Sequence, residues 1–362
     1  MAATGVTASD TIERTLGSLI ASTIDLQAER WPGLYESLTI AQLEKAVQDT
    51  RWHLQFLSAA LWADEQVLYD EYFEWARQLF DNHRLPAEWL TGSVEDMRAT
   101  LLRLLPETEG PLAAAFIDHA SDAKTLYELD GESLVDLDRP YGGLAAYYLA
   151  AVLGCDAARA VRALRDEIDS GTSLWDVYLR VIAPAQLEIG RLWYLGRLGV
   201  GQEHGSSAIT ERVMAELMSA VHPTSRRART VACACIGKER HSIGMRMVSD
   251  LFALDGWDVR FIGACTPATS IVSEAERTGA DLVALSMAMS HHIREMADTI
   301  AELRADPSTA DLPVLVGGHP FNVAPRLWLR VGADGCALDG AGAVRLGNEL
   351  VSGRPRSVLA AD

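Results

Sequence analysis

The sequence contains little cysteine, far fewer basic than acidic residues, and no long apolar run. Without an apolar run of about 20 residues, a membrane-spanning helix is not expected. Five cysteines among 362 residues, with no CxxC pair and no secretory signal, predict free thiols in a cytoplasmic protein. The net charge is −18, from 32 basic and 50 acidic side chains, so few phosphates could be neutralised and nucleic-acid binding is not expected.

Two helical regions occupy the first part of the chain, and a pattern of strands and helices follows them from residue 230. This succession indicates a multidomain α and α/β protein. Residues 1–135 carry apolar residues at three- and four-residue spacing, which predicts an all-helical N-terminal domain. Five of the nine tryptophans lie there; such side chains usually fill a core, although this many also suit a flat conjugated ligand. Residues 140–222 contain four helical segments of similar length separated by short Gly- and Ser-containing joints, the pattern of an up-and-down four-helix bundle.

From residue 230 the pattern changes to short apolar runs: TVACACIG, WDVRFIGA, DLVALSMAM, LPVLVGG and GCALDG. Because these runs show no polar alternation, we expect strands that are buried on both faces. Helical segments separate them at 244–254, 268–278, 291–304 and about 322–331. Residues 230–355 are therefore predicted to form a doubly wound, Rossmann-like parallel sheet, with ligand-binding loops at the carboxyl ends of its strands. No GxGxxG follows the first strand, so a dinucleotide is not expected.

His241 follows the first of these strands, in the loop where such sheets hold ligands. A lone loop histidine usually has a structural role, but here Glu239, Gly244, Ser286 and the pair Gly317-Gly318 belong to the same predicted edge. Glu239 could accept a hydrogen bond from one ring nitrogen of His241 and leave the other for a metal. The glycines would let a bulky planar ligand approach the backbone, and Ser286 would offer it a small polar partner.

These residues resemble the motifs of the cobalamin-binding domain family: ERHSIG in the turn, SMA on the third strand and GG on the fourth. The resemblance implies that His241 ligates cobalt from below, while the cofactor's nucleotide tail enters the sheet beside Ser286 and the Gly-Gly pair. Two residues depart from the family pattern. Glu239 stands in place of the usual Asp, which lengthens the arm but keeps its charge, and Ala288 is smaller than the usual branched residue.

Trp193, Glu203 and His204 lie around a predicted turn between two helices of the bundle. Taken alone they are ordinary helix-end residues, but beside the cobalamin turn they are similar to the Trp-x9-Glu-His signature of CarH-type photoreceptors. That resemblance implies adenosylcobalamin as the cofactor, with Trp193 packed on the adenosyl group and Glu203 and His204 bounding its pocket. Tyr194 stands where that family has a cobalt-capturing histidine, so His204 or water would have to take over that role here.

The N-terminal helices resemble no helix-turn-helix DNA-binding domain. The layout is instead similar to that of photocobilins, which carry a helical, globin-like domain and bind biliverdin beside the B12 cofactor. Such a bilin would be bound noncovalently, because residues 1–154 contain no cysteine; its propionates could meet His53, His83 or His119. The resemblance implies a cytoplasmic light sensor, not an enzyme, whose output is a light-dependent change in a homo-oligomer or in a signalling partner.

Two other interpretations stay open on the sequence. A corrinoid methyl carrier of a methyltransferase system would share the bundle and the histidine turn, although it explains neither the N-terminal domain nor the spacing from Trp193 to Glu203. A metal site at His291, His292 and His319 is a third interpretation, since these residues follow the third and fourth strands. Because His291 and His292 are adjacent, their side chains point in different directions. This favours loop residues that contact the corrin amides over ligands of a metal ion.

Overall fold

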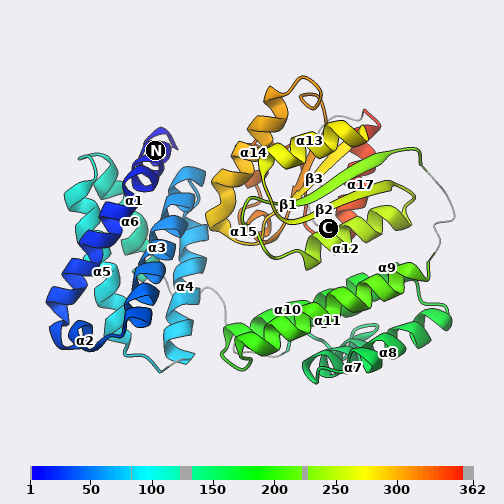
Figure 1. Cartoon of the computed structure of the whole chain (residues 1–362), viewed down its shortest axis with the longest axis horizontal. Helices are drawn as coiled ribbons and strands as arrows, with labels where there is room; N and C mark the ends of the chain where they lie inside the picture. Colours follow the sequence, from blue (N-terminus) through cyan, green and yellow to red (C-terminus); the bar gives the residue numbers. More distant parts are fainter. Residues whose placement is uncertain (1, 83, 123–132, 222–226, 354–362) are drawn as a thin grey trace. The chain divides into compact units, whose positions relative to one another are not determined.

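The computed structural model describes residues 2–82, 84–122, 133–221 and 227–353, and divides into two compact units. The first, here called the helical unit, covers Met1–Glu128 together with Met289–Arg294. The second, here called the sheet unit, covers Leu129–Ala288 and Glu295–Asp362 and contains both the bundle and the parallel sheet (Figure 1). Among the described residues, no helix combines the length and the apolar character that crossing a membrane requires.

The helical unit consists of long helices, so the prediction of an all-helical N-terminal region is confirmed. α3 begins with a capping box in which the Thr39 hydroxyl accepts a hydrogen bond from the backbone of Gln42 and the Gln42 side chain accepts one in return. α1 and α3 pack along each other and bury Leu54 and Leu57 of α3 completely. The helices are α1 (Ala2–Arg30), α2 (Pro32–Ser37), α3 (Ile40–Ala63), α4 (Gln66–Asn82), α5 (Ala87–Leu104) and α6 (Glu109–Asp122).

The predicted four-helix bundle is present in the sheet unit. Its third helix is continuous through α9, η1 and α10, and η1 is a π-helical turn in which the Ala183 N–H bonds to the Tyr178 carbonyl. Pro184 explains this turn, because a proline lacks the N–H and its ring crowds the carbonyl one turn earlier. The bundle elements are α7 (Gly142–Leu153), α8 (Ala157–Asp169), α9 (Leu174–Val177), η1 (Tyr178–Ile182), α10 (Ala183–Tyr194) and α11 (Val200–Ser219).

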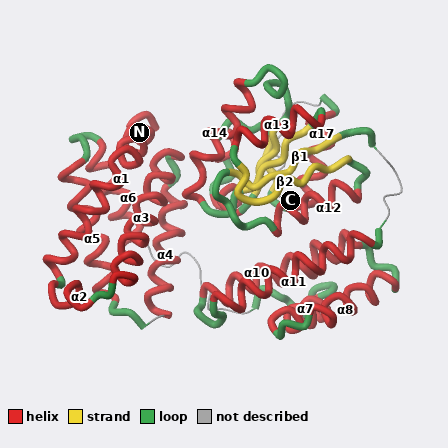
Figure 2. The backbone as a smooth tube through the Cα atoms, in the orientation of Figure 1, coloured by secondary structure: helices red, strands yellow, loops and turns green. Residues whose placement is uncertain are grey.

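The sheet has five parallel strands in the order β2-β1-β3-β4-β5, so the prediction of a doubly wound parallel sheet is confirmed. Figure 2 shows the strands together with helices around them. The expectation that every strand is buried on both faces is wrong for β2. This strand lies at the edge of the sheet, with β1 as its only described neighbour, and much of its length is exposed. The strands are β1 (Thr230–Ile236), β2 (Asp258–Thr266), β3 (Leu282–Ser286), β4 (Val314–Gly317) and β5 (Gly335–Ala337).

Helices cover both faces of the sheet, with α12 and α17 packed together on one side and α13 and α14 on the other (Figure 1). The helix expected at 322–331 is instead two short helices on either side of Pro325, which cannot donate the hydrogen bond that a continuous helix needs there. One hydrophobic core joins the bundle to the sheet. The remaining elements are α12 (Ile243–Leu254), α13 (Ala268–Thr278), η2 (Ser290–His292), α14 (Ile293–Ala305), α15 (His319–Val323), α16 (Leu327–Arg330) and α17 (Gly340–Val351).

Candidate functional site

The turn after β1 holds His241 in one orientation. The Glu239 carboxylate accepts a hydrogen bond from the His241 ring Nδ1 at 2.5 Å and from the His241 backbone N–H at 2.9 Å. Glu239 is almost completely buried, with 1% of its side chain exposed, whereas 63% of the His241 side chain is exposed. Because Nδ1 is engaged, Nε2 is the ring nitrogen left for a metal. The hydrogen bond expected from the sequence is therefore present.

The second oxygen of Glu239 connects two loops at the carboxyl edge of the sheet. Oε2 accepts a hydrogen bond from the Ala288 backbone N–H at 2.8 Å, just beyond β3. β1 lies between β2 and β3, so the order in which successive strands are added changes direction between β1 and β3, and ligands of doubly wound folds bind at this switch point. The glutamate that departs from the family pattern thus reaches both the histidine and the third-strand loop. No pattern in the sequence predicts its bond to Ala288, 49 positions away.

Charge strengthens the Glu239–His241 pair. Burial by itself would raise the pKa of Glu239, but the hydrogen bonds from His241 and Ala288 outweigh burial and hold that pKa at about 2. The hydrogen bond to Glu239 raises the pKa of His241 above its ordinary value; burial opposes this rise, and the charges of Glu239 and Glu203 add to it. The carboxylate is consequently ionised at neutral pH and polarises the imidazole.

The other predicted residues of the sheet lie at the same edge. Strand register aligns Cys235, Ser286 and Gly317 in one row at the carboxyl ends of β1, β3 and β4. A Cβ atom at Gly244 would have no neighbour within 4 Å, so open space lies beside the start of α12. Gly318 has a second reason for being glycine: its φ is +116°, and a Cβ there would lie 2.0 Å from the Met287 carbonyl oxygen.

Helix α11 of the bundle lies beside the His241 turn. Its Glu203 contributes to the raised pKa of His241, and its Glu211 accepts a hydrogen bond from the Ser242 hydroxyl at 3.1 Å. Glu203 also accepts hydrogen bonds from the His204 ring at 2.5 Å and from Ser207 at 2.9 Å, while 74% of the His204 side chain is exposed.

Trp193 is partly buried at the end of α10, and residues 195–199 form the expected turn before α11. With this turn, α11 begins close to the His241 turn, and the Glu203 carboxylate lies near enough to His241 to raise its pKa. No pattern in the sequence predicts the contact between Ser242 and Glu211.

The two predicted histidines of the helical unit that the structure describes differ in burial and in hydrogen-bond partner. His53 is buried on α3, where its Nδ1 lies 3.0 Å from the Tyr72 hydroxyl, and burial lowers its pKa to about 4. His119 on α6 is 61% exposed and pairs with Asp70 at 3.1 Å. His83 lies outside the described residues.

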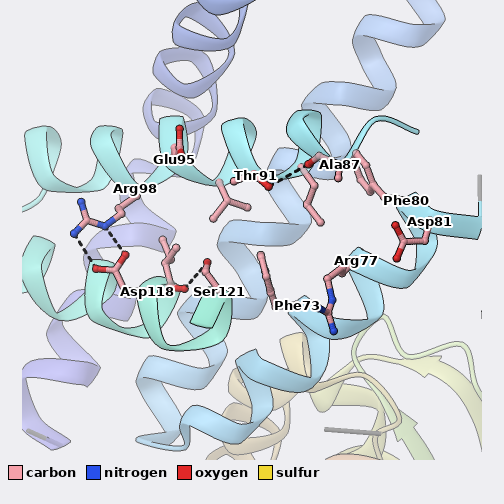
Figure 3. A pocket seen from close by; sticks show the side chains of 13 residues that line it. Phe73, Arg77, Phe80, Asp81, Ala87, Thr91, Glu95, Arg98, Asp118 and Ser121 are labelled. Atoms are coloured by element: carbon pink, nitrogen blue, oxygen red, sulfur yellow. Dashed lines mark hydrogen bonds and ion pairs between the residues drawn. The ribbon is translucent and has the colours of Figure 1, made fainter. Parts of the chain in front are cut away.

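A cavity of about 330 Å³ lies instead among α4, α5 and α6 (Figure 3). Its walls are largely apolar, and Arg77 and Arg98 line it, with Arg98 paired in two hydrogen bonds to Asp118. It is lined by Phe73, Arg77, Phe80, Asp81, Ala87, Leu90, Thr91, Val94, Glu95, Arg98, Ile117, Asp118 and Ser121.

His291 and His292 belong to the helical unit, where the His291 ring packs on Phe56 with centroids 4.7 Å apart and on His292 at 3.9 Å. His319 begins α15 in the sheet unit. Among the described residues, no three His, Cys, Asp or Glu side chains are grouped closely enough to hold a metal ion.

Comparison with known proteins gives two matches in the sheet unit. Residues 229–346 match a family model described as a B12 binding domain, and residues 144–218 match a second model of the same description. The HTH-type transcriptional repressor CarH of Myxococcus xanthus is 30% identical over 172 residues, which are 47% of this chain and 56% of that protein. Dimethylamine corrinoid protein 3 of Methanosarcina acetivorans is 30% identical over 112 residues, 31% of this chain and 51% of that protein.

One solved structure supports the fold. The monomethylamine corrinoid protein of Methanosarcina barkeri superposes with a TM-score of 0.52 at 18% identity and covers 58% of this chain and 100% of its own. The chain spans about half the length of the curated relatives it matches. Those relatives include both a repressor and a corrinoid protein, so they do not separate a sensor from a methyl carrier. The two matching regions, together with the His241 turn at the switch point of the sheet, support cobalamin binding by this chain.

Proposed function

We propose that this protein is a light sensor that binds adenosylcobalamin with His241 as the lower cobalt ligand. The observation that carries the proposal is the buried Glu239, which orients His241 at the sheet edge while α11 brings Glu203 to the same place. The spacing from Trp193 to Glu203, similar to that of CarH-type photoreceptors, supports the sensor interpretation over the carrier.

The donor set of the site suits cobalamin. An exposed imidazole whose Nδ1 is bound to a buried carboxylate is a strong, oriented nitrogen donor. The open space beside Gly244 leaves room for a bulky macrocycle, and the aligned edge of Ser286 and Gly317 suits the nucleotide tail. When bound, adenosylcobalamin supplies a cobalt–carbon bond that visible light breaks. His241 and Glu239 would hold the cofactor by its cobalt, and Trp193, Glu203 and His204 would bound its pocket and exclude water from it.

The proposed signal is a change in packing between α11 and the sheet. Ser242 and Glu211 join α11 to the His241 turn through an exposed hydrogen bond, which is weak enough to exchange with water. Losing the upper ligand would remove contacts that hold α11, and a moved α11 would alter self-association of the chain or binding of a signalling partner in the cytoplasm.

We further propose that the helical unit binds biliverdin at the cavity among α4, α5 and α6. Apolar walls suit the pyrrole rings. Arg77 and Arg98, which pair with Glu74 and Asp118, are the cationic side chains of the cavity that could in addition meet two propionates. Absorption spectra of protein expressed with and without a biliverdin supply test this. A red-absorbing band that weakens in Arg98→Ala and persists in the exposed control Arg103→Ala supports the site, and its absence from wild-type protein refutes it.

The lower ligand is tested by replacing His241 with alanine. The variant should bind adenosylcobalamin at least tenfold more weakly, and any bound cobalamin should lose the spectrum of histidine ligation. His119→Ala, an exposed histidine of the helical unit, is the matched control and should bind normally. An unchanged red chromophore in His241→Ala would refute ligation by this residue.

The sensor interpretation is tested with light. Protein loaded with adenosylcobalamin in the dark should change both its absorption spectrum and its elution volume under green light. If the spectrum changes but elution and partner binding do not, the protein responds to light without a quaternary output, which contradicts the proposed signal. If the spectrum does not change, the sensor proposal is wrong.

A corrinoid methyl carrier is the second candidate, favoured by the 30% identity to a dimethylamine corrinoid protein. A carrier would exchange methyl groups at cobalt in the dark when given a methylated amine and its methyltransferases. The sensor proposal expects no such turnover, so sustained dark methyl transfer would favour the carrier.

A further inference from the structure

Tyr178 joins three helices of the sheet unit through one hydroxyl group. The residue begins the π-helical turn η1, and its side chain is completely buried in the core shared by bundle and sheet. Its hydroxyl oxygen lies 2.8 Å from Asp250 Oδ2 on α12 and 3.3 Å from the Met214 carbonyl oxygen on α11. The hydroxyl group therefore lies between α12, which packs on the sheet, and α11, the helix that carries Glu203 and His204.

One hydroxyl cannot donate fully to both neighbours, because it has a single hydrogen. When Asp250 is ionised, its carboxylate is the stronger acceptor and takes this hydrogen, since hydrogen bonds to a charged partner are shorter and stronger. The Met214 carbonyl then receives no full bond from Tyr178. When Asp250 is protonated, its own O–H can donate to the Tyr178 oxygen, and the tyrosine hydrogen is free for Met214. A continuous series of hydrogen bonds then joins Asp250 of α12, Tyr178 of η1 and Met214 of α11.

The surroundings make both protonation states of Asp250 accessible. Burial raises the pKa of Asp250 to about 6, against the opposing effects of the Tyr178 hydrogen bond and the Arg246 charge. The titratable groups facing the pair are Arg246 of α12 itself, Cys233 of β1 and Tyr148 of α7. Burial raises the pKa of Tyr178 further above its ordinary value, so its hydroxyl keeps its hydrogen throughout.

We propose that Tyr178 and Asp250 form a proton-operated latch, in which protonation of Asp250 ties α11 to α12 through Tyr178 and ionisation releases α11. The latch itself rests only on the three groups described. Its consequence, easier opening of the bundle over the cobalamin at higher pH, rests on the proposed function. Tyr178 and Asp250 are thus positioning residues, which act through α11 and touch no cofactor.

The test is hydrogen exchange of α11 in the full-length, cobalamin-free protein, between pH 5 and 7.5 and corrected for intrinsic rates. Wild-type α11 should exchange up to about tenfold faster above pH 6, the effect of losing one hydrogen bond. Asp250→Asn, whose amide can donate like the protonated acid, should stay protected at both pH values. Tyr178→Phe should exchange fast at both.

The exposed, ion-paired Asp258 on edge strand β2 provides the matched control, and Asp258→Asn should behave as wild type. Equal, pH-independent protection of α11 in wild type would overturn the latch, as would a pH response that survives in Asp250→Asn. If Tyr178→Phe does not fold, the wild-type and Asp250→Asn series still decide. Because no cobalamin is used, failure of cobalamin binding and failure of the latch give separate results.

Discussion

Replacing Glu239 with glutamine should destabilise the sheet unit in a pH-dependent way. The buried carboxylate accepts three hydrogen bonds, two from His241 and one from the Ala288 N–H. A carboxamide has one accepting oxygen, and its NH2 group would face a donor that it cannot satisfy. The variant therefore loses the charge and leaves at least one partly buried N–H without an acceptor.

The depressed pKa of Glu239 gives the size of the effect. A shift from 4.5 to about 2 corresponds to about 3.4 kcal/mol of folding free energy at 1.36 kcal/mol per pKa unit. Because the native pKa is the lower one, this contribution is present above pH 4.5 and is lost as the pH falls towards 2. The stability difference between wild type and Glu239→Gln should be about 3 kcal/mol at pH 5 and about 1.5 kcal/mol at pH 3. When the pH rises above the raised pKa of His241, the imidazole loses its charge and its pairing with Glu239 contributes less to stability. The stability difference between wild type and Glu239→Gln then becomes smaller again.

Urea unfolding followed by circular dichroism at pH 5 and pH 3 measures this difference. The matched control is Glu203→Gln, a neighbouring carboxylate whose side chain is 29% exposed, which should cost no more than about 1 kcal/mol. If Glu239→Gln is as stable as Glu203→Gln at pH 5, or if its loss of stability is the same at both pH values, the Glu239 carboxylate does not stabilise the fold in this way.

Three further predictions follow from the described geometry. Gly318→Ala should lower the free energy of unfolding by more than about 2 kcal/mol, because the φ of this residue is +116° and a Cβ would meet the Met287 carbonyl. The thermal midpoint should fall with it, and an unchanged midpoint would contradict this prediction. Gly244→Leu should fold normally by circular dichroism, since a Cβ there meets nothing, but should take up at least tenfold less cobalamin; full uptake would show that the space beside α12 is not used. The raised pKa of Asp250 means that the native state binds its proton more tightly, so stability should fall by up to about 3 kcal/mol as the pH rises from 4 to above 6. Urea unfolding should show this slope in wild type and lose it in Asp250→Asn; a slope retained in the variant would assign it to another group.

The local sequence determined the helices, the strands and the part of the site formed by Glu239 and His241. Apolar runs without polar alternation predicted the strands, the change of period near residue 230 separated helices from sheet, and the ERHSIG turn predicted the bond between Glu239 and His241. These features depend on residues a few positions apart, whose geometry the backbone fixes directly.

Only the tertiary structure decided what distant segments do together. It put β2 at the edge of the sheet, joined Glu239 to Ala288 across 49 positions, and brought Tyr178 to Asp250 across 72. None of these contacts follows from residue type, because an aspartate on a helix is ordinarily solvated and strand order leaves no trace in a single apolar run. They arise when packing of the whole core sets which surfaces meet, and burial then gives otherwise ordinary side chains their shifted pKa values.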